Sequence, residues 1–375
     1  MKKDNLIFIH KLFKAFADSI IKVFLPLYIL KESQSLNLSM TYLIIFSLSV
    51  IIGMFIFKKF IQKYGIISII IHFIPIIITM GIFSFYKVDL LSVIISAILM
   101  SLSQVFYSVP INLIFATIDK KTNVGKFEIS TSIGKLIFTL ISSYLLSSEI
   151  KNSFLILSIF SSLFYIISVI PLFFMYKELN NNYLKYKKNN VNKGKIKLDK
   201  WFIIFHILFG IFQPIMDNLL PLYLYINNLS FQAVTLMVVL VEALKILINY
   251  LSQFLVKKNK SIICIIISSL LFLISSILIL IIKDSFWLYI LSILCSISFP
   301  LTFVPMFNLY CKYLNKTNNV YNGMINRDIE IFSCRPSLYS LSFIGFSLYP
   351  CLIIGVIIIP FMFLSEVKII NDSNK

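Results

Sequence analysis

Ionisable side chains interrupt the apolar segments of this sequence at helical spacing. Along residues 6–30 they recur three, four and four positions apart, which places them on one face of a helix: Lys11, Lys14, Asp18 and Lys22. An ionised group in an apolar segment is costly unless it faces a polar cavity or a partner of opposite charge. Asp18 and Lys22 lie near the middle of the segment and are predicted to meet such a partner. Lys11 and Lys14 lie near its start and are expected to extend toward the polar surface.

An internal repeat indicates where that partner lies. The chain reads FLPLYIL around Pro26 and LLPLYLY around Pro221, and it reads VPINLIFATIDKKTN around Pro110 and VPMFNLYCKYLNKTN around Pro305. Both pairs of prolines are 195 positions apart. A parallel repeat of half the chain predicts two like bundles of helices around a central site.

On this offset Asp217 aligns with Lys22, and Gln213 aligns with Asp18. In such a two-fold arrangement, equivalent positions of the first helix in each half face each other across the centre. We therefore predict a polar cluster of Asp18, Lys22 and Asp217 at the central site, with Gln213 beside it. The alternative is a buried ion pair that only holds the two halves together.

A third set of polar positions lies on the segment 232–256. Glu242 and Lys245 are three positions apart and share a helix face with Asn249, so the two charges are expected to neutralise each other. A buried carboxyl group beside a cavity suits reversible proton carriage. Glu242 or Asp18 is therefore the predicted site of proton coupling.

The segment 89–118 contributes uncharged polar side chains. Gln104 and Ser108 are one helical turn apart before Pro110, and Tyr107 lies on the adjacent surface. We predict that Gln104 and Tyr107 line the central cavity. Hydrogen bonding between neighbouring helices is the alternative, and it is favoured for the serines.

Charged residues also gather near the predicted start of the eleventh helix. The segment NRDIEIFSCRP contains the two arginines of the whole sequence, and the planar guanidinium group suits bidentate ion pairing. Its counterpart in the first half reads GKFEISTSIGK. One interpretation is a static ion network between helices, formed by Glu128, Lys135, Arg327, Asp328, Glu330 and Arg335.

Composition identifies the elements that position these residues. Hydrophobic residues make up 59% of the chain and its mean hydropathy is +0.92, far above the roughly 45–50% apolar content of globular domains. The fold class is therefore an all-α polytopic membrane protein, because each long apolar segment can form a helix that crosses a bilayer. About twelve such helices are expected, near 6–30, 40–58, 66–86, 89–118, 130–148, 153–176, 201–226, 232–256, 261–282, 286–313, 331–348 and 350–366.

Basic residues set the predicted topology. With a cytoplasmic N-terminus, 24 Lys and Arg residues fall in inner segments and 4 in outer loops, which predicts a protein of the cell membrane with both termini in the cytoplasm. The same distribution explains the net charge of +18 without nucleic-acid binding. Residues 178–200, rich in Lys and Asn, are expected to form a mobile cytoplasmic linker with a short amphipathic piece around Tyr183–Lys188.

Metal, cofactor and catalytic motifs are missing from the sequence. The five cysteines form no CxxC pair, and His10, His72 and His206 have no neighbour at the spacing of metal ligands, so packing roles are expected. The sequence shows no pair of catalytic groups that would indicate an enzyme. The chain contains no Walker A segment, so any transport must be driven by an ion or substrate gradient.

Six helices, a basic linker and six more helices in parallel repeat resemble the major facilitator superfamily over the whole chain. The resemblance implies an N-terminal six-helix bundle over residues 1–177, the linker over 178–200 and a C-terminal six-helix bundle over 201–375. In the loop FKKFIQKYG, Lys63 and Gly65 match the signature of that family. Gln62 and Lys58 stand where an acid and a glycine are expected.

Charged residues at the inner ends of the fifth and eleventh expected helices also resemble the cytoplasmic gate of that family, which would be made by Glu128, Lys135, Arg327, Asp328, Glu330 and Arg335.

The resemblance also implies a function. We expect a secondary active transporter that moves a small solute by alternating access with proton coupling, acting as a monomer in the lipid bilayer. The polar cavity suits polar, charged or zwitterionic solutes. A multidrug or peptide efflux protein is the alternative, although the glycine–proline signature of drug–proton antiporters is missing from STSIGKLIFTLISS. A non-transporting sensor or assembly partner is a further alternative.

Overall fold

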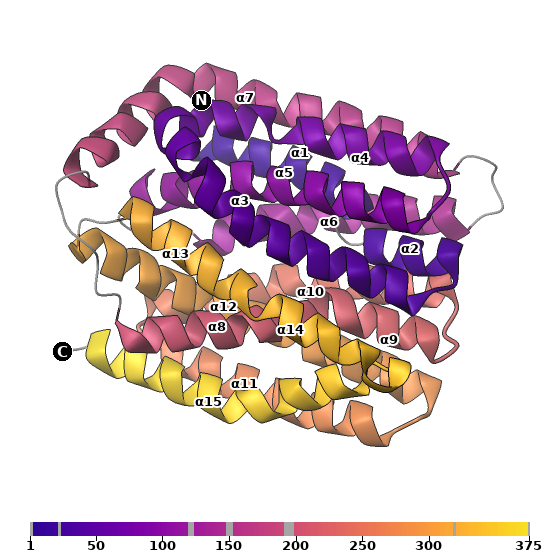
Figure 1. Ribbon diagram of the computed structural model, residues 1–375. Coiled ribbons are helices and arrows are strands. Elements are labelled where there is room, and N and C mark those ends of the chain that lie inside the picture. The colour runs from indigo at the N-terminus through magenta and orange to yellow at the C-terminus, as the bar shows by residue number, and fades with distance from the viewer. Residues whose placement is uncertain are drawn as a thin grey trace.

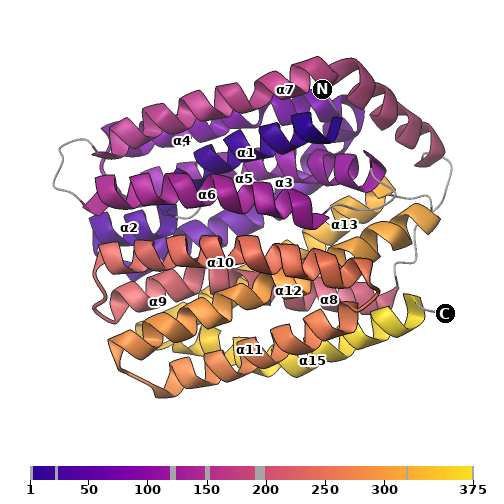
Figure 2. The same cartoon turned by 180° about the vertical axis from the view of Figure 1, so that it is seen from behind.

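The chain folds into helices that run side by side (Figure 1). The computed structural model describes residues 3–21, 24–118, 124–147, 153–190, 199–317 and 320–373. These residues contain no strand, which confirms the all-helical part of the predicted fold class. In Figure 1 the helices of the first half of the chain lie above those of the second half, and Figure 2 shows the same two groups from behind.

Each half begins with a helix that is interrupted. In the first half, α1 (Lys3–Ile21) is followed by α2 (Leu25–Ser33). In the second half, α8 (Lys200–Pro214) runs into a π-helical turn, η1 (Ile215–Leu219), and then into α9 (Leu220–Ile226). The expected single helices over 6–30 and 201–226 are therefore divided. The repeated prolines explain the restarts, because each lies in the first turn of the second piece, where a backbone N–H has no helical partner.

The next two expected helices are joined. α3 (Leu36–Ile71) covers the expected helix 40–58 and the loop after it, and α4 (Phe73–Phe85) completes the expected helix 66–86. Tyr64 has non-helical backbone angles, φ −129° and ψ 35°, and marks a kink between the two. The loop FKKFIQKYG is thus part of a kinked helical segment.

Matching aspartates begin the fourth long helix of each half. Asp89 precedes α5 (Leu90–Ile118) and accepts the Ser92 N–H at 2.8 Å. Asp284 precedes α12 (Ser285–Thr317) and accepts two backbone N–H groups of the next turn, each at 3.1 Å. An aspartate in this position satisfies N–H groups that the first helical turn leaves unpaired. The two aspartates are 195 positions apart, so these caps follow the same repeat as the prolines.

The helices before the linker are longer than expected. α6 (Val124–Ser147) starts before the predicted boundary at 130, and α7 (Ser153–Asn190) continues through much of the predicted linker. Residues 178–190 of the predicted linker are therefore helical, residues 191–198 lie outside the described residues, and the linker bounds themselves stay a prediction. The physical reason is that residues 178–190 contain neither proline nor glycine, so no residue in them stops the helix.

The rest of the second half consists of α10 (Phe231–Lys257), α11 (Ser261–Ile281), α13 (Val320–Ser333), α14 (Arg335–Ser340), the 3-10 turn η2 (Leu341–Phe346) and α15 (Tyr349–Ser373). The eleventh expected helix, 331–348, is thus divided at Cys334 and preceded by a helix that the sequence prediction missed. Arg327 and Asp328 lie within that helix rather than in a segment leading to it. Their charges lower its hydropathy, which is why the apolar pattern did not reveal it.

Eight helical segments in the described part of the chain are long and apolar enough to cross a membrane. They are Leu36–Ile71, Leu90–Ile114, Ser153–Phe174, Lys200–Ile226, Phe231–Lys257, Ser261–Ile281, Ser285–Thr317 and Tyr349–Ser373. Helices outside this set include α1, α6 and α13, which carry Asp18, Lys135 and Arg327.

The two halves meet where α6 packs against α10 and where α3 packs against α13 and α14. α6 and α10 run antiparallel (Figure 2). The Gly125 N–H donates to Gln253 Oε1 at 2.9 Å near one end, and the Ser143 and Thr235 hydroxyls are 2.5 Å apart near the other. We call the end with Gly125 the linker end, because α7 ends and α8 begins on that side (Figure 1).

Small residues allow close helix crossings in both halves. A Cβ atom on Gly134 of α6 would lie 2.7 Å from the Ala15 Cβ of α1. A Cβ atom on Gly210 of α8 would lie 2.1 Å from the Ile331 carbonyl oxygen of α13. Ala15 and Gly210 are 195 positions apart. The first helix therefore makes a close crossing at the equivalent position in each half.

Candidate functional site

A cavity of about 410 Å³ lies between the two halves of the chain. Side chains of α1, α2, α3, α5 and α6 line it from the first half, and side chains of α8, η1, α9, α10, α12, α13 and α14 line it from the second. Eleven predicted site residues are on its lining: Asp18, Gln104, Glu128, Lys135, Gln213, Asp217, Glu242, Lys245, Arg327, Asp328 and Arg335. Its volume is within the range of pockets that hold small molecules.

The predicted coupling cavity and the predicted cytoplasmic gate are not separate in space. Members of both sets line the same cavity, and Lys135 Nζ of the gate set is 3.7 Å from Glu242 Oε1 of the cavity set. The reason is that α6 and α10 are neighbours, so Lys135 in the middle of α6 faces the middle of α10. Glu330 is off the cavity lining, and its Oε2 is 2.7 Å from His206 Nδ1.

Four alternating charges connect the two halves across the cavity. Glu242 Oε1 is 3.7 Å from Lys135 Nζ and accepts from Lys245 Nζ at 3.1 Å, as the spacing of Glu242 and Lys245 predicts. Lys245 Nζ is also 3.9 Å from Asp217 Oδ1. We call these four residues the charge line. The middle of the charge line is buried, since the Glu242 side chain is 4% exposed. Its two ends are more accessible, because the Asp217 side chain is 38% exposed and the Lys135 side chain is 26% exposed.

The Gln213 amide connects Asp217 to an arginine. Gln213 Nε2 donates to Asp217 Oδ2 at 3.1 Å, and Gln213 Oε1 accepts from Arg335 Nη2 at 2.8 Å. Because a guanidinium group only donates, the amide oxygen must point to Arg335 and the amide nitrogen to Asp217. Arg335 is itself held over the Phe332 ring, 4.1 Å from the ring centroid. Asp217 is therefore positioned by a fixed polar contact.

One face of α5 lines the cavity, with residues four positions apart: Met100, Gln104, Ser108 and Asn112. Tyr107, which was expected beside Gln104, lies away from this lining. A helix turns by about 100° per residue, so Tyr107 is rotated away from Ser108 and faces the interior of the first half.

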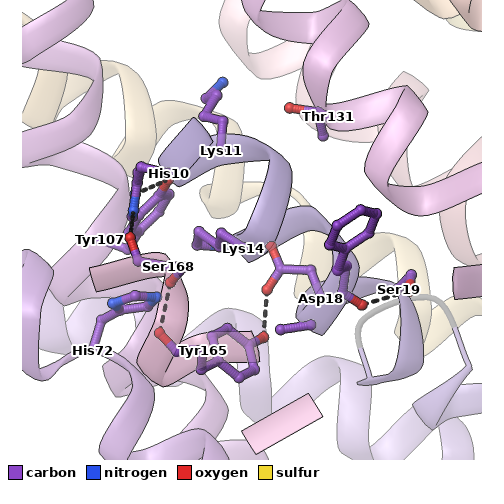
Figure 3. Close-up of polar contacts among 12 residues, drawn as sticks. His10, Lys11, Lys14, Asp18, Ser19, His72, Tyr107, Thr131, Tyr165 and Ser168 are labelled. Carbon is purple, nitrogen blue, oxygen red and sulfur yellow. Dashed lines mark hydrogen bonds and ion pairs between the residues drawn. The ribbon is translucent and has the colours of Figure 1, made fainter. Parts of the chain in front are cut away.

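Asp18 reaches the cavity from α1 but is bound by side chains of its own half (Figure 3). Lys14, one turn earlier, forms an ion pair with Asp18 Oδ2, and the Tyr165 hydroxyl of α7 donates to Oδ1 at 2.5 Å. Lys14 also lies over the Tyr107 ring, 4.1 Å from its centroid. The expectation that Lys14 extends to the polar surface is therefore wrong, because an acid and an aromatic ring hold it in the interior, where it is 4% exposed.

Buried histidines complete this cluster (Figure 3). His10 Nδ1–H donates to the Ser168 carbonyl at 2.7 Å, so Nε2 of the neutral ring accepts from the Tyr107 hydroxyl at 3.1 Å. The His72 ring also packs against Tyr107, and the centroids of the two rings are 4.7 Å apart. We call Lys14, Asp18, Tyr107, Tyr165, His10 and His72 the α1 cluster.

Lys22 lies outside the described residues, so its place in the predicted cluster with Asp18 and Asp217 stays a prediction. The partners that the structure gives Asp18 and Asp217 differ: Lys14 and Tyr165 for the first, Gln213 and Lys245 for the second. The polar lining residues that the sequence reasoning missed include Asn112, Thr131, Ser132 and Asn218. Helical spacing contained a signal for Asn112, which lies one turn beyond Ser108.

The described part of the chain has no group of three or more His, Cys, Asp or Glu side chains arranged to hold a metal ion. The groups that line the cavity offer ion pairing, hydrogen bonding and proton exchange at carboxylates. Lys11 adds an ion pair to Glu128 at 3.3 Å, which ties α1 to α6 beside the cavity.

A family model described as Major Facilitator Superfamily matches residues 7–326, which include helices of both halves. No protein with a curated description matches the sequence.

Solved structures with a similar fold cover nearly the whole chain. A bacterial homologue of the iron transporter ferroportin, in an outward-facing state, is 14% identical with a TM-score of 0.68 over 98% of this chain and 99% of that one. A POT family transporter in complex with 5-aminolevulinic acid is 14% identical with a TM-score of 0.66 over 99% and 96%. A human organic anion transporter is 10% identical with a TM-score of 0.66 over 96% and 98%. At these identities the likeness is one of fold.

Proposed function

Because this chain belongs to the major facilitator superfamily, and is a multi-pass membrane transporter rather than an enzyme, we propose that it moves a small polar solute by alternating access. One observation carries the proposal. The charged cavity lies between the halves of the chain, and Lys135 and Glu242 pair across it. A site at such an interface is exposed to each side in turn when one half rocks against the other.

The packing of α6 against α10 supplies a closure at each end of that cavity. The bond from Gly125 to Gln253 lies at the linker end, and the bond between Ser143 and Thr235 lies at the opposite end. We propose that each bond breaks when its end opens. Gly125 supports this role, since a Cβ atom there would lie 2.7 Å from Gln253 Oε1 and prevent the close approach.

The moving units in this proposal are two six-helix bundles, residues 1–177 and 201–375. The 24 basic residues of the predicted inner segments favour a cytoplasmic linker and cytoplasmic termini in the cell membrane. The transporter acts as a monomer, because each half contributes one wall of a single cavity.

Asp18 is our choice for the proton-carrying acid over Glu242. Protonation of Glu242 would take the acid partner from Lys135 in the middle of the cavity. Protonation of Asp18 would release Lys14, which already lies over the Tyr107 ring and keeps that contact. Asp18 also borders the cavity, so a solute and a proton can reach the same region.

The test is transport by the purified full-length protein in proteoliposomes that contain a pH-sensitive dye. A panel of amino acids, sugars and organic acids is added outside, and solute-dependent proton movement is recorded. We expect Asp18→Asn to lose proton movement while retaining exchange of labelled solute across the membrane. Asp372→Asn, at an exposed position near the end of α15, is the matched control and should behave like the wild type.

Two results would overturn parts of this proposal. Proton movement that survives in Asp18→Asn but disappears in Glu242→Gln would move the coupling role to Glu242. If no solute of the panel moves or exchanges, secondary transport of small polar solutes is the wrong function.

A further inference from the structure

We infer that the transported solute is a compact zwitterion, with its ammonium group bound by Asp217 and its carboxylate bound by Lys135. This inference rests on the proposed transport function and names its substrate class and two subsites. It follows from unequal pairing along the charge line. The two inner residues, Glu242 and Lys245, are paired closely with each other, whereas the two outer residues, Lys135 and Asp217, have longer contacts.

The acidic end of the line has room for a cation. Lys245 makes its closer contact with Glu242, at 3.1 Å, and is 3.9 Å from Asp217, the upper limit of an ion pair. Asp217 is also the most accessible of the charged side chains that form these ion pairs, at 38%. A carboxylate that lines a cavity with such a distant cation is a binding position for the ammonium group of a solute.

The basic end of the line has room for an anion. Lys135 reaches across from α6 to Glu242 at 3.7 Å, whereas Lys245 holds the same oxygen at 3.1 Å. Lys135 can therefore turn to a carboxylate in the cavity without leaving Glu242 unpaired. Because Lys135 belongs to the first half and Asp217 to the second, a solute that bridges them binds both moving units at once.

The length of the line fits a small molecule. The gap between Lys135 Nζ and Asp217 Oδ1 is at most the sum of three contacts, 3.7, 3.1 and 3.9 Å. A solute that bridges the two ends would use about 3 Å of this gap for each of its two ion pairs. The length that remains within the limit accommodates the separation between the two charges of an amino acid. A longer dipolar molecule does not fit alongside the line in this arrangement.

The backbone conformation at Asp217 supports a binding role. Asp217 lies in the π-helical turn η1, and such turns inside helices are often found at functional sites. Gln213 and Arg335 act as positioning residues, since the amide orientation fixed by Arg335 directs the amide nitrogen to Asp217 Oδ2. One carboxylate oxygen is thus held in place while the other faces Lys245 and the cavity.

The other acids of the cavity are less available to a cationic group. Asp18 is held by Lys14 and Tyr165, Glu128 by Lys11, and Asp328 by Arg327 at 3.1 Å. Aromatic side chains, including Phe209, Phe299 and Phe303, complete the cavity wall and favour an apolar body between or beside the two charges.

The experiment measures binding to the full-length protein in nanodiscs by calorimetry, without any transport step. The probes are α-, β- and γ-amino acids, each with the matched amine that lacks the carboxylate and the matched carboxylate that lacks the amine. We expect at least one amino acid to bind about tenfold or more tightly than both of its matched analogues, as for loss of an ion-paired group.

Variants assign the two ends. Asp217→Asn and Lys135→Gln are each expected to weaken binding of that amino acid about tenfold, while Lys135→Arg retains it. In addition, Asp217→Asn should no longer discriminate the amino acid from its matched carboxylate. Lys257→Gln and Asp372→Asn, both at exposed positions, are matched controls and should bind like the wild type. Size-exclusion profiles establish that each variant is folded.

The outcomes separate this inference from the transport proposal. Binding of single-charge analogues as tight as that of the amino acid, or unchanged binding by both folded variants, overturns the zwitterion assignment. If the proteoliposomes transport sugars or monovalent organic acids and no amino acid binds, the transport function stands and the substrate class is wrong. A zwitterion that binds but is never transported supports the site and contradicts the transport function.

Discussion

Asp18 on α1 and Asp217 on η1 lie in the first helical segments of the two halves, but their partners and their exposure differ. Asp18 is enclosed by Lys14 of its own helix and Tyr165 of its own half. Asp217 receives one amide N–H and a distant lysine, and its side chain remains 38% exposed. Both acids line the cavity, but Asp18 is held by two side chains of its own half, whereas Asp217 is more exposed and has only a distant lysine.

This difference indicates a division of roles between like halves. An enclosed acid can exchange a proton with little change in its surroundings, because its lysine has a second contact at the Tyr107 ring. An exposed acid can bind a solute. The repeat thus supplies two equivalent scaffolds, and the residues around each acid decide what the acid does.

The largest difference is expected when each acid loses its lysine. Lys14→Met should destabilise the protein by about 3 kcal/mol, since it leaves an enclosed carboxylate without that cation. Lys245→Met should cost less, because Glu242 keeps Lys135 and Asp217 faces the cavity. Chemical denaturation in one detergent measures both. Adding Asp18→Asn to Lys14→Met should recover most of the loss, and equal losses in the two single variants would remove the contrast.

The helix crossings provide the next comparison. Gly210→Ala should lower stability by about 1–3 kcal/mol, because its Cβ would meet a backbone carbonyl oxygen that cannot turn away. Gly134→Ala meets the Ala15 Cβ and the Leu12 carbonyl at 2.7 Å, a less severe approach, and should cost less. Thermal unfolding of both variants tests this order. Gly81→Ala is the control, since a Cβ atom there meets nothing within 4 Å.

Hydrogen bonds of His10 on α1 and His206 on α8 should give a smaller effect. Tyr107→Phe removes a bond to buried His10 Nε2 and should cost about 1–2 kcal/mol. Glu330→Gln keeps an acceptor for His206 at a partly exposed position and should change stability less. Thermal shift at neutral pH compares the two variants. A larger loss for Glu330→Gln would mean that its charge, rather than its hydrogen bond, stabilises the second half.

The helix caps should show the smallest effect and one with a defined pH dependence. The backbone N–H of Ser92 lowers the pKa of the Asp89 carboxyl group below its usual range. Asp89 therefore stabilises the folded state at neutral pH, and this contribution is lost as pH falls through and below the ordinary value of about 4. Asp89→Ala should lower Tm slightly at pH 7, with a smaller difference near pH 3. Asp284→Ala, at the equivalent cap, tests whether the second half behaves alike; a Tm difference for Asp89→Ala that grows at low pH would contradict the cap.

Much of the site was predictable from local spacing. Glu242 and Lys245 share a helix face by their separation, and the structure shows their bond. Gln104 and Ser108 line the cavity because positions four apart share a face. Spacing failed for Tyr107 and Lys14, because it defines a face of a helix but not which neighbouring helix that face meets.

The sequence alone determined the helical membrane fold, the 195-residue repeat and the positions at which charge enters apolar helices, because these depend on composition and on intervals along the chain. Only the tertiary structure decided which charges meet. Tyr165 reaches Asp18, and Lys135 reaches Glu242, across separations of more than a hundred residues. The rotation and packing of whole helices made one acid enclosed and the other open, and no local pattern encodes that rotation.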